Sequence, residues 1–100
     1  MTNKFAVYTD SFEFAPSQFP SIECAYLALD DRDNKLVALC DTLEEAQAVL
    51  ATLQVSTRRY SHSLAYAEVA FIEEGAYEQD EDGEWEFVMG SNIYDFKADR

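Results

Sequence analysis

An acidic run late in the chain is the stretch whose side chains come nearest to a recognised chemistry. Glu78, Asp80, Asp82 and Gly83 occupy positions 1, 3, 5 and 6 of an EF-hand calcium loop. The match then fails, because position 1 is Glu rather than Asp and position 12, normally a bidentate Glu, is Met89. Strand-like rather than helical sequence also flanks the run. The sequence therefore predicts no metal site here.

The residues that usually carry catalysis are sparse and scattered. His62 is the only histidine, and neither a nucleophile nor an orienting acid is indicated beside it. Cys24 and Cys40 lie sixteen positions apart in apolar segments, which predicts reduced core residues in a cytoplasmic protein rather than a zinc site. The three glycines form no phosphate-binding loop. We expect no cofactor and no enzymatic activity.

Charge is the one extreme property of the composition. Twenty Asp and Glu stand against seven Lys and Arg, so the formal net charge is −13 and the pI is near 4.1. Between Arg59 and Lys97 there are ten carboxylates and no Lys or Arg. This balance disfavours direct binding to nucleic acid and to anionic membranes.

Acidity of this degree points to a basic partner. Like charges held together repel one another and reduce folding stability, so a functional reason is worth seeking. The main hypothesis is a small acidic binding protein that imitates nucleic acid and occupies a basic nucleic-acid-binding surface of another protein, as inhibitors of the anti-restriction or anti-CRISPR type do. The expected partner-binding residues are Glu73, Glu74, Glu78, Asp80, Glu81, Asp82, Glu84 and Glu86.

Two alternatives remain open. The chain could be a generic partner-binding or regulatory domain, in which acidity is incidental or steers association with some other basic protein. It could also owe its acidity to solubility at high salt, for which the presence of only three lysines speaks weakly. The sequence predicts no oligomeric state.

The elements that would carry these residues begin with a strong helix signal at residues 42–53. Thr42 followed by Glu45 forms a capping box. Leu43, Ala46, Leu50 and Leu53, flanked by Val49, repeat at helical spacing and predict one apolar stripe. Arg58 and Arg59 stand near the end of this helix and could complement its dipole.

A similar phrase occurs twenty-one residues earlier. Ser21 aligns with Thr42, and Ile22, Ala25, Tyr26 and Leu29 repeat at helical spacing, which predicts a second helix over residues 22–30. The rival interpretation is a hairpin of residues 26–30 and 35–40 closed at Asp33 and Asn34.

The remaining segments predict strands. Residues 4–8 form a short apolar strand, after which a loop containing two prolines runs to residue 20. Residues 35–40 lack polar alternation, which is typical of a strand that is covered on both faces or lies centrally. Residues 64–77 and 84–90 predict an antiparallel hairpin with Gly83 in the turn and a bulge at Gly75, and residues 93–96 either extend it or cross a sheet edge.

Side-chain alternation in the second hairpin strand predicts which face is buried. Trp85, Phe87 and Met89 fall on one face, which we expect to be core, while Glu84 and Glu86 fall on the other. Together the segments predict one α+β domain over residues 1–100. Its expected architecture is a single mixed β-sheet of about four strands, in the order strand, helix, strand, helix, strand, strand, with two helices packed on one face.

Overall fold

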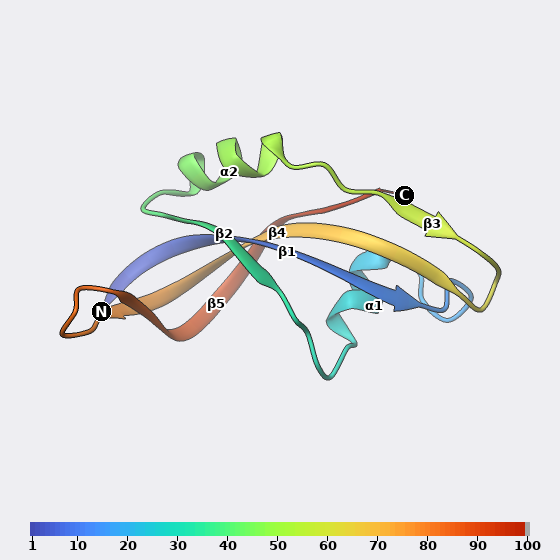
Figure 1. Cartoon of the computed structure of the whole chain (residues 1–100), viewed down its shortest axis with the longest axis horizontal. Coiled ribbons are helices and arrows are strands. Elements are labelled where there is room, and N and C mark those ends of the chain that lie inside the picture. The colour runs from blue at the N-terminus through green and yellow to red at the C-terminus, as the bar shows by residue number, and fades with distance from the viewer. Residues whose placement is uncertain (100) are drawn as a thin grey trace.

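The computed structural model of the protein describes residues 1–99 and has a single five-stranded sheet with two helices (Figure 1). Every strand pairing is antiparallel. The strands run in the order β2-β1-β4-β3, and β5 pairs with β4. The elements are β1 (Thr2–Phe14), α1 (Ile22–Leu27), β2 (Lys35–Cys40), α2 (Leu43–Thr52), β3 (Thr57–Arg59), β4 (Ala65–Gln79) and β5 (Trp85–Ala98).

The single-sheet α+β class is confirmed, but two of its predicted details are wrong. The sheet is antiparallel rather than mixed, because the chain between β1 and β2 reverses direction instead of crossing over the sheet. The strand count is five rather than about four, because the short segment Thr57–Arg59 pairs with the start of β4.

The first strand is much longer than residues 4–8. It continues to Phe14, which pairs with Ala65, so the first half of the predicted loop over residues 9–20 is strand. Phe12 is buried between exposed Ser11 and Glu13, which is the alternation of a half-buried strand. The two prolines, Pro16 and Pro20, both lie in the irregular segment that follows this strand.

The helices lie on opposite faces of the sheet, not on one face as predicted. Alternate residues of a strand point to opposite faces. In β4, Val69 and Phe71 belong to the core beneath α1, whereas Ala70 and Ile72 belong to the core beneath α2. Figure 1 shows α2 above the arched sheet and α1 below it. The sheet therefore separates two small cores, since its central strands are apolar on both sides.

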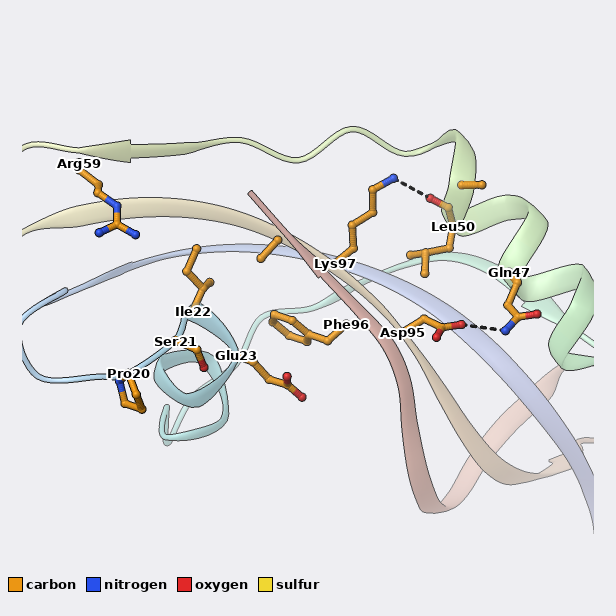
Figure 2. A pocket seen from close by; sticks show the side chains of 12 residues that line it. Pro20, Ser21, Ile22, Glu23, Gln47, Leu50, Arg59, Asp95, Phe96 and Lys97 are labelled. Atoms are coloured by element: carbon orange, nitrogen blue, oxygen red, sulfur yellow. Dashed lines mark hydrogen bonds between the residues drawn. The ribbon is translucent and has the colours of Figure 1, made fainter. Parts of the chain in front are cut away.

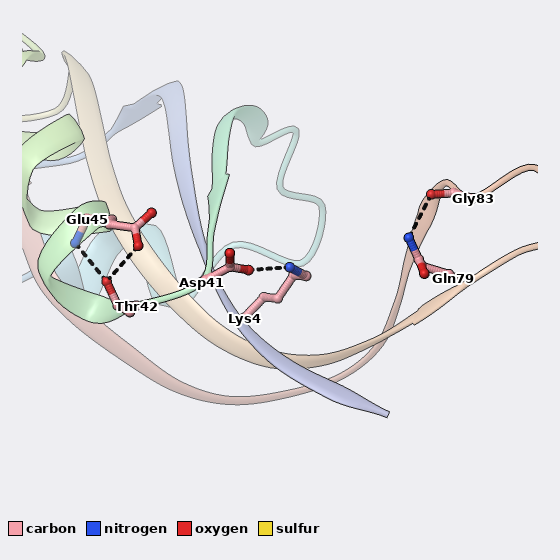
Figure 3. Close-up of polar contacts among 6 residues, drawn as sticks. All are labelled: Lys4, Asp41, Thr42, Glu45, Gln79 and Gly83. Carbon is pink, nitrogen blue, oxygen red and sulfur yellow. Dashed lines mark hydrogen bonds and ion pairs between the residues drawn. The ribbon is translucent and has the colours of Figure 1, made fainter.

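Both predicted helix caps are present. Thr42 Oγ1 accepts a hydrogen bond from the Glu45 N–H at 3.2 Å, and the Glu45 carboxylate lies 3.2 Å from the same hydroxyl (Figure 3). Ser21 Oγ accepts from the Cys24 N–H at 3.1 Å, so the helix rather than the hairpin forms after Ser21. This second helix ends at Leu27, three residues before its predicted end.

The strand β2 lies at the edge of the sheet rather than at its centre. It pairs with β1 alone among the strands of residues 1–99. Leu36 and Val37 keep 57% and 43% of their surface exposed, while Cys40 is buried beneath α2. The run of apolar residues therefore does not mark a strand covered on both faces.

The predicted C-terminal hairpin is confirmed and is longer than expected. β5 continues past Gly90 to Ala98, so residues 93–96 extend the strand instead of crossing an edge. The pairing shifts register at three places. One shift lies beside Gly75, but the extra residue there is Ser91 of β5, not a residue of β4.

Two smaller predictions have mixed outcomes. Cys40 is buried as expected, but Cys24 is exposed on α1, because it falls on the outer side of that short helix. Arg58 and Arg59 belong to β3 instead of meeting the end of α2. No helix within residues 1–99 is long and apolar enough to cross a membrane.

Candidate functional site: an acidic hairpin arm

The hairpin that joins β4 to β5 projects beyond the rest of the sheet. Thr2 of β1 pairs with Tyr77, and this is the last contact of β1 with β4. Beyond it only two strands remain, with Glu78 opposite Glu86 and Gln79 opposite Trp85. We call residues 78–86 the acidic arm; it forms the orange loop at one end of the molecule in Figure 1.

Local turn chemistry holds the tip of the arm. The Gly83 N–H donates to the Asp80 carbonyl at 3.1 Å, and Gly83 has a φ of +84°, which glycine adopts without steric cost. Asp80 Oδ1 accepts from the N–H groups of Asp82 and Glu84, both at 2.9 Å. Gln79 Nε2 donates to the Gly83 carbonyl at 3.1 Å (Figure 3). The carboxylate of Asp80 is therefore an organiser of the turn.

The two faces of the arm differ in chemistry. The pairing register places Glu78 and Glu86 on the face that β4 shares with α2. Asp80 and Glu84 follow on the same face in the turn, where the Asp80 N–H donates to the Glu84 carbonyl at 2.8 Å. The other face carries Gln79 and Trp85, and at the base of the arm it continues into the buried Tyr77 and the half-exposed Phe87. Glu81 and Asp82 lie at the tip and are exposed. The arm is thus an acidic ribbon with an aromatic reverse side.

The structure does not bring Glu73 and Glu74 into the arm. They lie near the middle of β4 and, as neighbours on a strand, face opposite sides of the sheet. The side chains of Asn3, Tyr94 and Asn92 donate hydrogen bonds to the Glu74 carboxylate, and they lower its pKa. Burial raises the pKa of Glu73, although nearby Arg32 opposes that effect. Glu74 is therefore a structural carboxylate, and Glu73 belongs to a different surface.

The aromatic face of the arm is not core, contrary to the sequence prediction. Trp85 and Phe87 remain 37% and 46% exposed, because no helix covers this end of the sheet. Met89, expected on the same face, pairs with Ala76 on the other face, because Val88 is an extra residue in the pairing between Phe87 and Met89. Trp85 makes a cation–π contact with the Lys4 ammonium, which lies 4.2 Å from its ring centroid.

The charges of the arm are not neutralised within the protein. Among residues 1–99, the one ion pair joins Lys4 to Asp41 and involves no carboxylate of the arm (Figure 3), although the Lys4 ammonium also contacts the Trp85 ring. The same part of the chain contains no group of three or more His, Cys, Asp or Glu that could hold a metal ion. The arm can therefore attract a basic surface, and its turn carboxylates are not arranged as calcium ligands.

A cavity of about 760 Å³ lies between α1, α2 and the end of β5 (Figure 2). Its charged lining is balanced, with Glu23 and Asp95 against Arg59 and Lys97. Two of these groups are already bound. Asp95 Oδ2 accepts from Gln47 Nε2 at 2.8 Å, and the Lys97 ammonium donates to the Leu50 carbonyl at 3.2 Å and to the Leu53 carbonyl at 2.5 Å. Lys97, rather than Arg58 and Arg59 as predicted, therefore provides the positive charge at the end of α2.

Sequence reasoning found the carboxylates of the arm but missed two features of the site. It placed Trp85 and Phe87 in the core. The predicted hairpin strands were longer than the other predicted strands, which indicates that the end of the hairpin extends beyond the sheet. It found no role for Lys97, because no local pattern connects a residue to carbonyls 44 and 47 positions away.

No protein-family model matches the chain, and no curated protein or solved structure is significantly similar to it.

Proposed function

We propose that this protein is a non-enzymatic binding protein whose acidic arm occupies a basic, nucleic-acid-binding surface of another protein. The observation that carries the proposal is the row of uncompensated carboxylates on one face of a projecting two-stranded arm. A projecting ribbon can enter a groove that a flat acidic surface could not reach.

The spacing of these carboxylates supports imitation of nucleic acid. Alternate residues on a strand are ~6.6 Å apart, and each step along the arm presents a carboxylate from both strands. Glu78 with Glu86 forms one such pair, and Asp80 with Glu84 forms the next. The arm thus offers about one charge per 3.3 Å, close to the ~3.4 Å per charge of one DNA strand along its axis.

The aromatic reverse side supports a second candidate, an ordinary protein interface whose acidic rim only steers association. Exposed aromatic residues are enriched where proteins bind one another, and charges at a rim act mainly on the association rate. Trp85 and Phe87 fit that description. The two candidates differ in whether nucleic acid competes with this protein for its partner.

The test begins with affinity capture from a bacterial lysate, with and without added duplex DNA. Under the proposal, captured proteins are nucleic-acid-binding proteins that added DNA releases, and their affinity falls steeply with salt. The double variant Glu84→Gln, Glu86→Gln keeps side-chain shape but removes two charges from the arm. Its association rate should fall about tenfold or more, with no loss of folding stability.

The matched control is Glu13→Gln, Glu23→Gln, which removes the same net charge from exposed positions outside the arm. It should bind within about twofold of the unmodified protein. Equal losses in both double variants would show that net charge alone, not the arm, attracts the partner. A partner that binds this protein and DNA together would exclude imitation of nucleic acid and favour the ordinary interface.

A further inference from the structure

A second hollow, of about 340 Å³, lies on the α1 face between the loop after α1 and the middle of β4 and β5. Its lining includes two aromatic side chains, Tyr26 and Phe71, three acidic ones, Asp30, Asp31 and Glu73, and the basic Arg32. We call it the α1-face hollow. It is separate from the acidic arm, which begins five residues beyond Glu73.

Glu73 is the distinctive group of this hollow. Its carboxylate is partly buried, yet within residues 1–99 it has no ion-pair partner within 4 Å and no hydrogen-bond donor. The side chain leans across β5 at Gly90, where a Cβ atom would stand 3.1 Å from Glu73 Oε2. The absence of a side chain at Gly90 thus leaves space for a carboxylate that is partly buried without a direct partner but still reaches solvent.

The chain's own Arg32 shows which chemistry the hollow accepts. The guanidinium carbon of Arg32 lies 5.6 Å from the ring centroid of Tyr26, within the range of a cation–π contact. Within residues 1–99 no ion pair joins Arg32 to Glu73, so the guanidinium nitrogens lie more than 4 Å from the carboxylate oxygens. The Arg32 guanidinium therefore lies over the Tyr26 ring but forms no ion pair with Glu73.

We infer that the α1-face hollow is a binding site for a guanidinium group, such as an arginine side chain of a partner, and that Arg32 occupies part of it in the free protein. An incoming guanidinium would take the place of Arg32 over the Tyr26 ring, which is only 1% exposed in the free protein, and donate to Glu73, while Arg32 moves aside toward solvent and the nearby Asp30 and Asp31. A planar guanidinium suits this site better than an ammonium, because it stacks on rings and donates two parallel hydrogen bonds. The inference goes beyond the proposed function and holds whether or not the acidic arm binds a partner.

The test uses N-acetyl-arginine amide as the probe, titrated into the full-length protein and followed by NMR at the Ile93 methyl and Phe71 ring signals. Because Arg32 competes with the probe, Arg32→Ala should tighten binding about fivefold. Adding Glu73→Gln to that variant should weaken binding about tenfold. N-acetyl-lysine amide should bind more weakly than the arginine probe in every variant.

The control is Glu84→Gln, which removes the same charge from the acidic arm and should leave probe affinity within about twofold. Equal weakening by Glu73→Gln and Glu84→Gln would overturn the inference, since the probe would then respond only to net charge. Arg32→Ala binding no tighter than the unmodified protein would also overturn it. The amide spectra of all variants verify folding. None of these outcomes depends on a partner of the arm. A negative result for the α1-face hollow therefore leaves the proposed function of the arm unaffected, and a negative result for the arm leaves the hollow unaffected.

Discussion

At the scale of single residues, neighbouring carboxylates in one strand have opposite roles. Glu74 is held by three hydrogen-bond donors, whereas Glu73 is partly buried without one. The direction of each pKa follows from these surroundings, because donors favour the charged form and burial opposes it. Composition alone treats the two residues as equivalent parts of one acidic surface.

This difference predicts opposite pH dependences of stability. The pKa of Glu74 is lowered on folding, so its contribution is present above the ordinary glutamate pKa of ~4.3 and is lost as pH falls through its folded pKa. Glu74→Gln should therefore be less stable than the unmodified protein at pH 7 and similar to it near pH 3. The pKa of Glu73 is raised, so Glu73→Gln should be more stable at pH 7, with a gain that disappears on acidification. Urea denaturation across this pH range measures both, and parallel curves would contradict the two assignments.

Trp85 provides a further prediction at this scale. Its ring is partly exposed and rests on the Lys4 ammonium, so Trp85→Ala should cost about 1 kcal/mol, from lost cation–π contact and partial burial. Tyr26→Ala, at a fully buried position, should cost about 3–5 kcal/mol. Urea denaturation of both variants makes the comparison. A Trp85→Ala loss as large as that of Tyr26→Ala would mean that the arm is packed as core.

At the scale of elements, α2 is secured at its two ends by different kinds of contact. Thr42 caps the first turn from the position immediately before the helix, whereas Lys97 reaches the last carbonyls from β5. The second contact gives the Leu53 carbonyl a donor, adds one to the Leu50 carbonyl, which already accepts from the Leu53 N–H, and places a positive charge at the negative end of the helix dipole.

The two ends should therefore contribute separately to stability. Thr42→Ala should cost about 1 kcal/mol. Lys97→Met keeps most of the stem and should cost about 1–2 kcal/mol, because two carbonyls lose a charged donor. The residues share no partner, so the double variant should show the sum of the two losses. Thermal denaturation followed by circular dichroism checks this. A Lys97→Met variant with an unchanged midpoint would mean that water replaces the ammonium at no cost.

At the scale of the whole molecule, an elongated fold carries a large uncompensated charge. The principal extents are 49 × 27 × 20 Å, and the acidic arm stands at one end of the long axis. An elongated shape lets like charges stay apart, but a net charge of −13 with a single ion pair within residues 1–99 still opposes folding.

Salt should therefore stabilise the protein. Raising ionic strength from ~0.01 M to ~1 M shortens the Debye length from ~30 Å to ~3 Å and screens repulsion among the carboxylates. The melting temperature in sodium chloride should rise by at least about 4 °C, which corresponds to ~1 kcal/mol in a domain of this size. A smaller rise is expected for Glu84→Gln, Glu86→Gln, because part of the repulsion is already removed. A melting temperature that falls with salt would show that favourable charge contacts outweigh the repulsion.

The sequence by itself determined the features that depend on neighbours in the chain. The caps at Ser21 and Thr42 bond to N–H groups three residues on, and the turn at Gly83 closes over four residues, so local patterns suffice to predict them. The net charge and its concentration in the C-terminal part are also properties of the sequence alone.

Only the tertiary structure decided which faces are covered and which side chains are left without partners. The apolar run of β2 is an edge strand, the aromatic residues of the arm are exposed, and the helices lie on opposite faces, although each local pattern suits the other outcome equally well. The physical reason is that burial depends on segments far apart in the chain, as the pairing of Thr2 with Tyr77 and the reach of Lys97 to Leu50 show. For the same reason, the sequence pattern grouped Glu73 with the arm carboxylates, whereas in the structure it lines the α1-face hollow with Tyr26 and Arg32.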